Sequence, residues 1–447
     1  MAIPSDVQYI LTKLHSNGYE AYAVGGCVRD SLLSLKPNDW DITTNATPDQ
    51  MAACFKDNKI IETGLKHGTL TIMLNGTGYE VTTYRIDGEY TDHRRPDSVQ
   101  FVGELRLDLE RRDFTVNAMA MDESETVVDL FNGQEDLRNG IIRCVGEPEK
   151  RFGEDALRII RALRFASVYD FEIDKATADA AYRLRGTLAN VSVERIFVEL
   201  KKLLCGKGVY RILHDYPWII FTVFPALQNM YGFRQLNPNH SMDVWEHTLK
   251  AVSSIQPDPV YRLTMLFHDS GKPFTHYFGA NGIDRFKGHQ YYSAEIAKEC
   301  LLYMKADTYT IKRVSMLVAE HDLMMYAAKN GPTEQLIRLG RDDFLALFPV
   351  FEADLSAHNP DVIPQYILSL NKLKRDTEAV LTSGICLTVK ELNITGNDLR
   401  AIGIEGPSIG TVMNSLVRQV ALKGLPNVKE ALLTKALELV KCHPENS

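Results

Sequence analysis

The sequence predicts an α+β protein, with a head of mixed sheet and helices over residues 1–150 followed by a long all-α remainder. Residues 70–74 and 79–84 flank Asn75-Gly76 and alternate apolar with polar side chains, which is typical of a β-hairpin. From about residue 150 the apolar residues recur at helical spacing. We expect four domains: the head, a helical neck at 151–232, a helical domain at 233–370 and a helical tail at 371–447.

The head begins with an amphipathic helix at residues 6–17 and a strand at 22–24 that runs into Gly25-Gly26. Two carboxylates, Asp39 and Asp41, follow one residue apart. On a strand they would project from the same face. Mg²⁺ prefers a few carboxylates together with phosphate oxygens, so this pair beside a glycine-rich turn predicts a nucleotide site. Taken alone, the glycines suit a tight turn and the carboxylates a solvated strand end.

A third carboxylate is expected at Glu80, which lies on the later strand of the predicted hairpin. Its alternative interpretation is a surface residue on an edge strand. Residues 86–96 are polar and contain glycine and proline, which indicates a mobile loop or a solvated connection.

Two arginine-rich segments complete the candidate nucleotide site. In the first, Arg112 suits triphosphate oxygens, while Asp113 and Asn117 could bond a ribose hydroxyl. In the second, Asp155 and Arg158 stand three residues apart on a predicted helix, where each could orient the other toward a base. Helix capping and surface ion pairs are the structural alternatives. Arginines recur every third residue along this helix, at 158, 161 and 164.

The turn followed by Asp-x-Asp resembles the nucleotidyltransferase superfamily that includes DNA polymerase β. With Glu-Val-Thr-Thr-Tyr-Arg at 80–85, Arg-Arg-Asp-Phe-Thr-Val-Asn-Ala at 111–118 and Glu-Asp-x-x-Arg at 154–158, the order of motifs resembles the class II tRNA nucleotidyltransferases. These are the CCA-adding enzymes, with the bacterial poly(A) polymerases as close relatives. The resemblance covers about residues 20–166.

This resemblance implies a polymerase-β-like head that adds C, C and A to the 3′ end of tRNA from CTP and ATP, without a nucleic-acid template. It implies that Asp39 and Asp41 bind Mg²⁺, that Glu80 is the third catalytic carboxylate, and that the loop at 86–96 serves the switch from C to A addition. We assign nucleotide binding to Gly25, Gly26, Arg29, Arg112, Asp113, Asn117, Asp155, Arg158, Arg161 and Arg164.

Histidines and aspartates suggest a second site in the domain at 233–370. Imidazole plus carboxylate is a ligand set for transition metals. The order His…His-Asp…Asp resembles the HD-domain phosphohydrolases, which implies a divalent metal and hydrolysis at RNA 3′ ends or of nucleotides. The predicted ligands are His247, His268, Asp269 and Asp354, with His289 and His321 as further candidates. The alternative is a structural relic that only completes the helical body.

The tail resembles the tRNA-binding tail of Gram-positive-type CCA-adding enzymes, although a simple pair of packing helices would give the same pattern. The net charge of −8 counts slightly against a nucleic-acid partner, but a local basic face would suffice. Seven scattered cysteines and the lack of a signal peptide or a long apolar run predict a cytoplasmic protein without a membrane segment.

The sequence therefore predicts a CCA-adding enzyme with tRNA, CTP and ATP as partners. An A-adding enzyme, a poly(A) polymerase or an HD phosphohydrolase are the alternatives that the sequence leaves open, and it does not define the oligomeric state.

Overall fold

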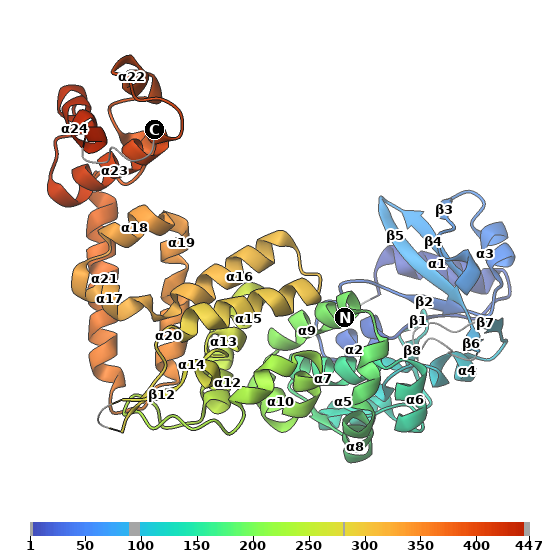
Figure 1. Cartoon of the computed structure of the whole chain (residues 1–447). Coiled ribbons are helices and arrows are strands. Elements are labelled where there is room, and N and C mark those ends of the chain that lie inside the picture. The colour runs from blue at the N-terminus through green and yellow to red at the C-terminus, as the bar shows by residue number, and fades with distance from the viewer. Residues whose placement is uncertain (1–2, 89–98, 280–281, 442–447) are drawn as a thin grey trace. The chain divides into compact units, whose positions relative to one another are not determined.

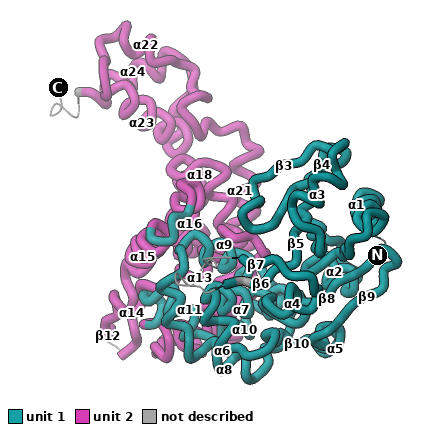
Figure 2. The backbone as a smooth tube through the Cα atoms, turned by 90° about the vertical axis from the view of Figure 1, so that its right-hand side faces the viewer, with its two compact units in different colours: residues 1–228, 303–306 teal, residues 229–302, 307–447 magenta. Residues whose placement is uncertain are grey.

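The structure, a computed structural model, describes residues 3–88, 99–279 and 282–441. Its contacts divide the chain into two compact units, residues 1–228 with 303–306 and residues 229–302 with 307–447 (Figure 2). The division after residue 228 lies close to the boundary expected between the neck and the following domain. The finer split into four domains stays a prediction.

The first unit contains a seven-stranded sheet in the order β3-β4-β5-β2-β1-β8-β9 (Figure 1). Its strands are β1 (Ala21–Val24), β2 (Ile42–Thr44), β3 (Lys59–Ile61), β4 (Thr69–Leu74), β5 (Thr77–Thr83), β8 (Met119–Met121) and β9 (Val127–Asp129). Neighbouring strands are antiparallel except β2 and β5, which are parallel. The predicted hairpin is confirmed as β4 and β5. Asn75 and Gly76 have φ of 50° and 82°, as its tight turn requires.

The helices of the head are α1 (Ser5–Ser16), α2 (Gly26–Leu32), α3 (Pro48–Cys54), α4 (Leu105–Glu110) and α5 (Gly133–Asn139). The predicted first helix is confirmed, since α1 buries Val7, Ile10, Leu11 and Leu14 as its apolar stripe requires. Strands β6 (Arg85–Asp87) and β7 (Val99–Phe101) pair with each other. Most of the expected loop at 86–96 lies outside the described residues.

The rest of the first unit is helical, as predicted. Its helices are α6 (Pro148–Glu154), α7 (Leu157–Tyr169), α8 (Lys175–Leu184), α9 (Val193–Leu204), α10 (Val209–Asp215) and α11 (Pro217–Val223). A short parallel pair, β10 (Ile141–Ile142) with β11 (Glu172–Ile173), joins head and neck within this unit. Helix α7 packs against α9 and buries Ile159, Ile160 and Leu163, while its three arginines are half-buried.

Among its described residues, the second unit has helices and one small hairpin, β12 (Tyr277–Phe278) with β13 (Asp284–Arg285). Its first helices are α12 (Val244–Ser254), α13 (Pro259–Phe267), α14 (Lys272–Thr275), α15 (His289–Tyr303), α16 (Thr308–Glu320) and α17 (Met324–Asn330). They are followed by α18 (Thr333–Leu339), α19 (Arg341–Leu345), α20 (Leu347–Ser356) and the long α21 (Ile363–Thr382).

The C-terminal helices are α22 (Gly396–Ala401), α23 (Ser408–Lys423) and α24 (Lys429–Lys441). They share a small core of their own that includes Leu399, Leu416 and Leu432. The predicted fold class is therefore confirmed: a head with a mixed sheet, followed by a mostly helical chain.

Candidate functional site

The three predicted carboxylates lie at two neighbouring central strands of the sheet, Glu80 within β5 and Asp39 and Asp41 just before β2. Asp41 directly precedes β2, and its carbonyl oxygen accepts a hydrogen bond of 2.9 Å from the Val24 amide of β1. In the parallel pair of β2 and β5, Ile42 lies opposite Val81, so Asp41 lies next to Glu80. Glu80 is not on an edge strand, because β5 lies between β4 and β2.

One detail of the prediction was wrong. Asp39 and Asp41 do not lie within a strand but in the segment before β2, where only Asp41 joins the backbone pairing. Residues 35–41 have to cross from the end of α2 to the sheet, and the regular pairing with β1 starts at Ile42.

Asp41 carries the clearest electrostatic signature of the head. Protein atoms around its carboxyl group, which is still reached by solvent, raise its pKa to about 6. The negative charges of Asp39 and Glu80 act in the same direction, and Arg112 opposes them. Clustered carboxylates with a single nearby cation favour a bound divalent ion, which would remove the repulsion.

The glycine turn brings Arg112 close to these carboxylates. Gly25 has φ of +80°, a conformation that side chains other than glycine rarely adopt, and it precedes α2. A Cβ atom at Gly25 would lie 2.9 Å from Nη1 of Arg112. Glycine is therefore required here both for the turn and for the approach of the guanidinium. Gly26 begins α2.

Arg29 is buried and makes internal contacts. It is 6% exposed, and its guanidinium donates to Oδ1 of Asn117 at 2.5 Å and to Oδ1 of Asp30 at 2.8 Å. The Tyr169 hydroxyl donates to the same Asp30 oxygen at 2.8 Å, and the Tyr169 and Phe165 rings lie beside the guanidinium. This network fixes α2 and Asn117 to α7, so Arg29 helps to hold the start of α2 in place.

Asp113 links the head to the neck. Its Oδ2 accepts hydrogen bonds from Nε and Nη2 of Arg161 at 2.8 and 2.6 Å, and its Oδ1 accepts one from the side-chain Nδ2 of Asn117 at 3.0 Å. Burial alone would raise the pKa of Asp113, but Arg161, the Asn117 hydrogen bond and Arg158 outweigh it and hold the pKa well below its usual range. Asp113 is therefore a fixed anion at this junction.

The predicted Asp155–Arg158 pair is wrong. Asp155 has extended backbone (φ −139°, ψ 104°) and separates α6 from α7, so the two residues do not share a helix face. The Asp155 carboxylate accepts from the Leu157 amide at 3.0 Å and pairs with Arg195 at 2.7 Å. Arg158 instead donates to Glu154 at 2.7 Å and to the Arg111 carbonyl at 2.9 Å.

Two residues of this region escaped the sequence analysis, Arg195 and Glu199, and Glu154 was quoted in a motif without a role of its own. Arg164 pairs with Glu199 of α9 at 2.7 Å, and Arg161 approaches the same carboxylate at 3.6 Å. A signal was present, since Arg195 and Glu199 are four residues apart and so lie on one face of a helix. Helix α7 is thus held by α9.

The second unit brings together all six predicted histidine and aspartate ligands. The ring Nδ1 atoms of His247, His268, His289 and His321 lie 2.7–3.1 Å from backbone carbonyl oxygens, at Ala357, Met265, Phe286 and Val318 respectively. Each Nδ1 therefore carries a proton, and each ring directs Nε2 toward the centre. Metal-binding histidines are held in this way.

These atoms form two groups, each with ligand atoms within 4.8 Å of one another. His247, His268 and Asp354 make one, and Asp269, His289 and His321 make the other. Asp269 lies between them: its Oδ2 is 3.3 Å from Nε2 of His268, and its Oδ1 is 3.3 Å from Nε2 of His289. One carboxylate thus faces both groups, as a ligand bridging two ions would.

Charge in this centre favours a cation. Burial alone would lower the pKa of His268, but Asp269 and Asp354 raise it to about 10. The pKa values of Asp269 and Asp354 lie well below the usual range, because neighbouring histidines outweigh the effect of burial. The donor set therefore fits divalent metal ions, although the geometry does not select one metal.

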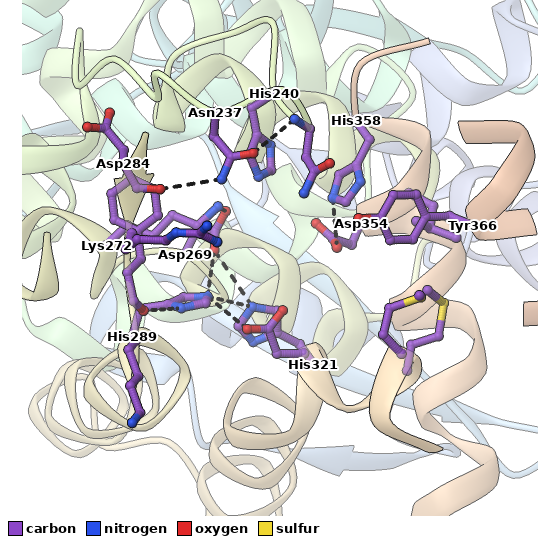
Figure 3. Close-up of a pocket in the computed structure, with 18 of the residues that line it drawn as sticks. Asn237, His240, Asp269, Lys272, Asp284, His289, His321, Asp354, His358 and Tyr366 are labelled. Atoms are coloured by element: carbon purple, nitrogen blue, oxygen red, sulfur yellow. Dashed lines mark hydrogen bonds and ion pairs between the residues drawn. The ribbon is translucent and has the colours of Figure 1, made fainter. Parts of the chain in front are cut away.

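Four of the six candidate ligands, Asp269, His289, His321 and Asp354, line a cavity of about 470 Å³, which we call the metal-ligand cavity (Figure 3). Its wall includes Lys272, whose ammonium group lies 2.7 Å from Asp269 and donates to Gln235 at 2.8 Å. Two histidines that sequence analysis missed also line it, the half-buried His240 and the buried His358. His358 lies 3.3 Å from Asp354, and the His240 and His358 rings are 4.8 Å apart. Lys272 follows His268-Asp269 closely, which was an available signal.

Comparison with known protein families defines the class of the head. Residues 21–143 match the Poly A polymerase head domain, and residues 170–215 match the family described as the probable RNA and SrmB-binding site of polymerase A. With carboxylates at the centre of a mixed sheet beside a glycine turn, these matches define a nucleotidyltransferase.

Relatives over the full length define the family. A CCA-adding enzyme of Ligilactobacillus salivarius is 33% identical over 442 residues, which covers 97% of this chain and 96% of that protein. The solved structure of the Bacillus stearothermophilus CCA-adding enzyme in complex with CTP has a TM-score of 0.68 and 30% identity and covers 98% of both chains. The chain belongs to the CCA-adding enzyme family.

A further relative, the CCA-adding enzyme of Oceanobacillus iheyensis, is 53% identical over 204 residues. That match spans 46% of this chain and 50% of the relative. Within the part of the chain that the structure describes, each helix is too short or too polar to cross a membrane.

Proposed function

We propose that this chain completes the 3′ end of tRNA by adding C, C and A from CTP and ATP. The observation that carries the proposal is the cluster of Asp39, Asp41 and Glu80 beside the Gly25 turn, in a chain of this family. In the proposed reaction the tRNA 3′-hydroxyl attacks the α-phosphorus of the nucleotide and forms a new phosphodiester bond. The bond from the α-phosphorus to the oxygen that bridges to the β-phosphorus breaks, and pyrophosphate leaves. A cytoplasmic location belongs to the same proposal.

Mg²⁺ bound by Asp39 and Asp41 would supply charge neutralisation for the attacking and leaving oxygens. The chain's own residues position the reactants. The backbone at Gly25 and Gly26 leaves room for phosphates, and Arg112 lies close enough to neutralise them. Such positioning and charge stabilisation supply most of the catalysis in this kind of reaction.

Base selection belongs to the neck helix in this proposal. Asp155 and Arg158 are held by different partners, Arg195 and Glu154. They can therefore offer an acceptor and a donor at separate points of a base edge. A wrong base would leave one of them unpaired, which is the strongest basis for rejection.

An extension assay tests the catalytic assignment. Purified protein with Mg²⁺ would receive a tRNA transcript that ends before CCA, together with CTP and ATP. We expect Asp41→Asn to lower the extension rate at least ~100-fold, a size typical for loss of one main electrostatic element. Asp57→Asn, which alters an exposed acid in the same head, serves as the matched control. Equal rates for both variants would contradict the assignment.

A second activity is favoured by the histidine-aspartate centre. We propose that it hydrolyses phosphate esters at RNA 3′ ends: water adds to phosphorus, the ester P–O bond breaks and the alcohol oxygen takes a proton. Bound divalent ions would activate the water. Asp269 would bridge the ions, and Lys272 would orient Asp269.

This second activity has its own test. Protein reconstituted with Mn²⁺ would be assayed for phosphate release from a 3′-phosphorylated RNA, alongside its metal content by mass spectrometry. Asp269→Asn should lose bound metal and phosphate release while CCA addition persists. Retention of both metal and phosphate release in this variant would contradict the proposed centre.

A further inference from the structure

Five exposed aromatic side chains lie on the elements that flank the metal-ligand cavity. They come from α14, β12 and the first turn of α15, and their exposed fractions run from 47% to 69%. We call them the aromatic rim: Phe274, Tyr277, Phe278, Tyr291 and Tyr292. Exposed rings gathered in this way mark a binding surface more often than scattered apolar residues do.

The rim includes a preformed stack and a direct connection to the cavity. The Phe274 and Tyr292 rings are stacked with centroids 5.2 Å apart and planes 24° apart. Tyr277 lines the cavity and lies opposite Arg285 in the hairpin register. The rim thus contains one ring pair that is already stacked, between α14 and α15, and one ring, Tyr277, in the cavity wall.

Positive charge accompanies the rings. Arg285 and Lys287 are exposed and line the cavity beside Tyr277. Of the acidic side chains that line it in the described part of the chain, Asp322 is the exposed one. Aromatic rings next to arginine and lysine are the common device for binding single-stranded nucleic acid, since bases stack on the rings and phosphates pair with the cations.

We propose that the aromatic rim binds the unpaired nucleotides of a single-stranded RNA whose 3′ end enters the metal-ligand cavity. This inference rests on the second proposed activity, because that activity is what would bring an RNA end to the cavity. The binding itself does not require hydrolysis. The bases would stack on the rim, and the phosphates near the cavity would pair with Arg285 and Lys287.

The protein should therefore bind oligonucleotides more tightly than single nucleotides. A mononucleotide reaches only the cavity, whereas an oligonucleotide also covers the rim. Loss of one stacking ring should raise the Kd for an oligonucleotide by about five-fold or more.

The test uses the full-length protein in chelator and a fluorescently labelled RNA hexanucleotide with a 3′-phosphate, with binding followed by anisotropy. Phe278→Ala and Phe278→Leu should both raise the Kd by about five-fold or more, because leucine keeps apolar bulk but lacks a flat ring. Tyr309→Ala removes an aromatic side chain that is 68% exposed elsewhere in the same unit, and it should bind like the wild type. Thermal unfolding would verify that each variant is folded.

The outcomes separate the two proposals. If the Phe278 variants bind like the wild type, or if Tyr309→Ala weakens binding equally, the rim proposal is overturned. If the Phe278 variants bind weakly but the wild type with Mn²⁺ releases no phosphate, the rim stands and the hydrolytic activity fails. With active protein, the rate on the hexanucleotide relative to uridine 3′-monophosphate should fall in the Phe278 variants.

Discussion

Arg161→Ala should destabilise the first unit by removing the main partner of a buried carboxylate. Arg161 makes two charge-assisted hydrogen bonds to Asp113, at 2.8 and 2.6 Å, and Asp113 is 8% exposed. Removing one partner of a buried pair costs about 3–5 kcal/mol. The Arg161 side chain is itself 30% exposed, so the lower end, about 3 kcal/mol, applies. For a unit of this size that corresponds to a fall in Tm of roughly 6–12 °C.

The pH dependence of this loss has a definite sign. The pKa of Asp113 lies well below its usual range when Arg161 is present, so the wild-type pair stays charged from pH 8 to pH 5. Its stabilisation is present above the ordinary carboxyl pKa of about 3.9 and is lost only as the pH falls through the lower folded value. Arg161 is the strongest of the groups that oppose burial, so we expect the pKa of Asp113 to rise without it and proton uptake to relieve the buried charge at low pH. The difference in Tm between wild type and variant should therefore shrink from pH 8 to pH 5.

Differential scanning calorimetry at the two pH values measures both effects. The double variant Arg161→Ala/Asp113→Asn should recover much of the loss, because it removes the buried charge together with its partner. A fall in Tm below about 2 °C for Arg161→Ala, or a difference independent of pH, would refute the reasoning, since 2 °C is less than 1 kcal/mol for a unit of this size.

Three further predictions concern the candidate nucleotide site of the first unit. Gly25→Ala should slow tRNA extension at least ~10-fold, because the left-handed backbone and the contact with Arg112 exclude a side chain. The control is Gly76→Ala, which should affect stability alone, because Gly76 has φ of +82° but open space around it. The extension kinetics of both variants test this prediction. Since the pKa of Asp41 is raised to about 6, a proton competes with Mg²⁺ for its carboxylate below that pH. The Mg²⁺ concentration for half-maximal extension should therefore rise several-fold when the pH is lowered from 7.5 to 5.5. The same half-maximal concentration at both pH values would contradict this. Arg195→Ala removes the ion-pair partner of Asp155 and should reduce the discrimination of CTP against UTP by about ten-fold. Arg183→Ala, which breaks an exposed ion pair, is the control. Unchanged misincorporation of UTP in Arg195→Ala would contradict the role of Arg195.

Local patterns predicted the parts of the molecule that local rules decide. The first helix, the hairpin at Asn75-Gly76 and the glycine turn follow from periodicity and from backbone conformations that few residues adopt. The six ligands of the second unit were also found, because histidine and aspartate in that order carry their own chemistry. Their division into two groups was not predictable, since His247 and Asp354 are 107 positions apart in the chain.

Predictions that assumed a regular element failed where the backbone departs from it. Asp155 was placed on a helix because its spacing to Arg158 suits one, but its extended conformation ends α6 and sends its carboxylate to Arg195. Asp39 and Asp41 were placed on a strand by their alternation, yet pairing with β1 begins only at Ile42. Arg195 and Glu199 were missed because their helix has the pattern of any amphipathic helix, and only the fold brings it against α7.

The most direct test of the central claim is the length of product made on tRNA. Transcripts that end before CCA or after CC would be incubated with the protein, Mg²⁺ and CTP and ATP, separately and together, and resolved at single-nucleotide length. The proposed function predicts addition of C, C and A in that order, followed by a stop. Addition of A to the CC-ended transcript alone, long A tails on any RNA, or no extension under any condition would contradict it.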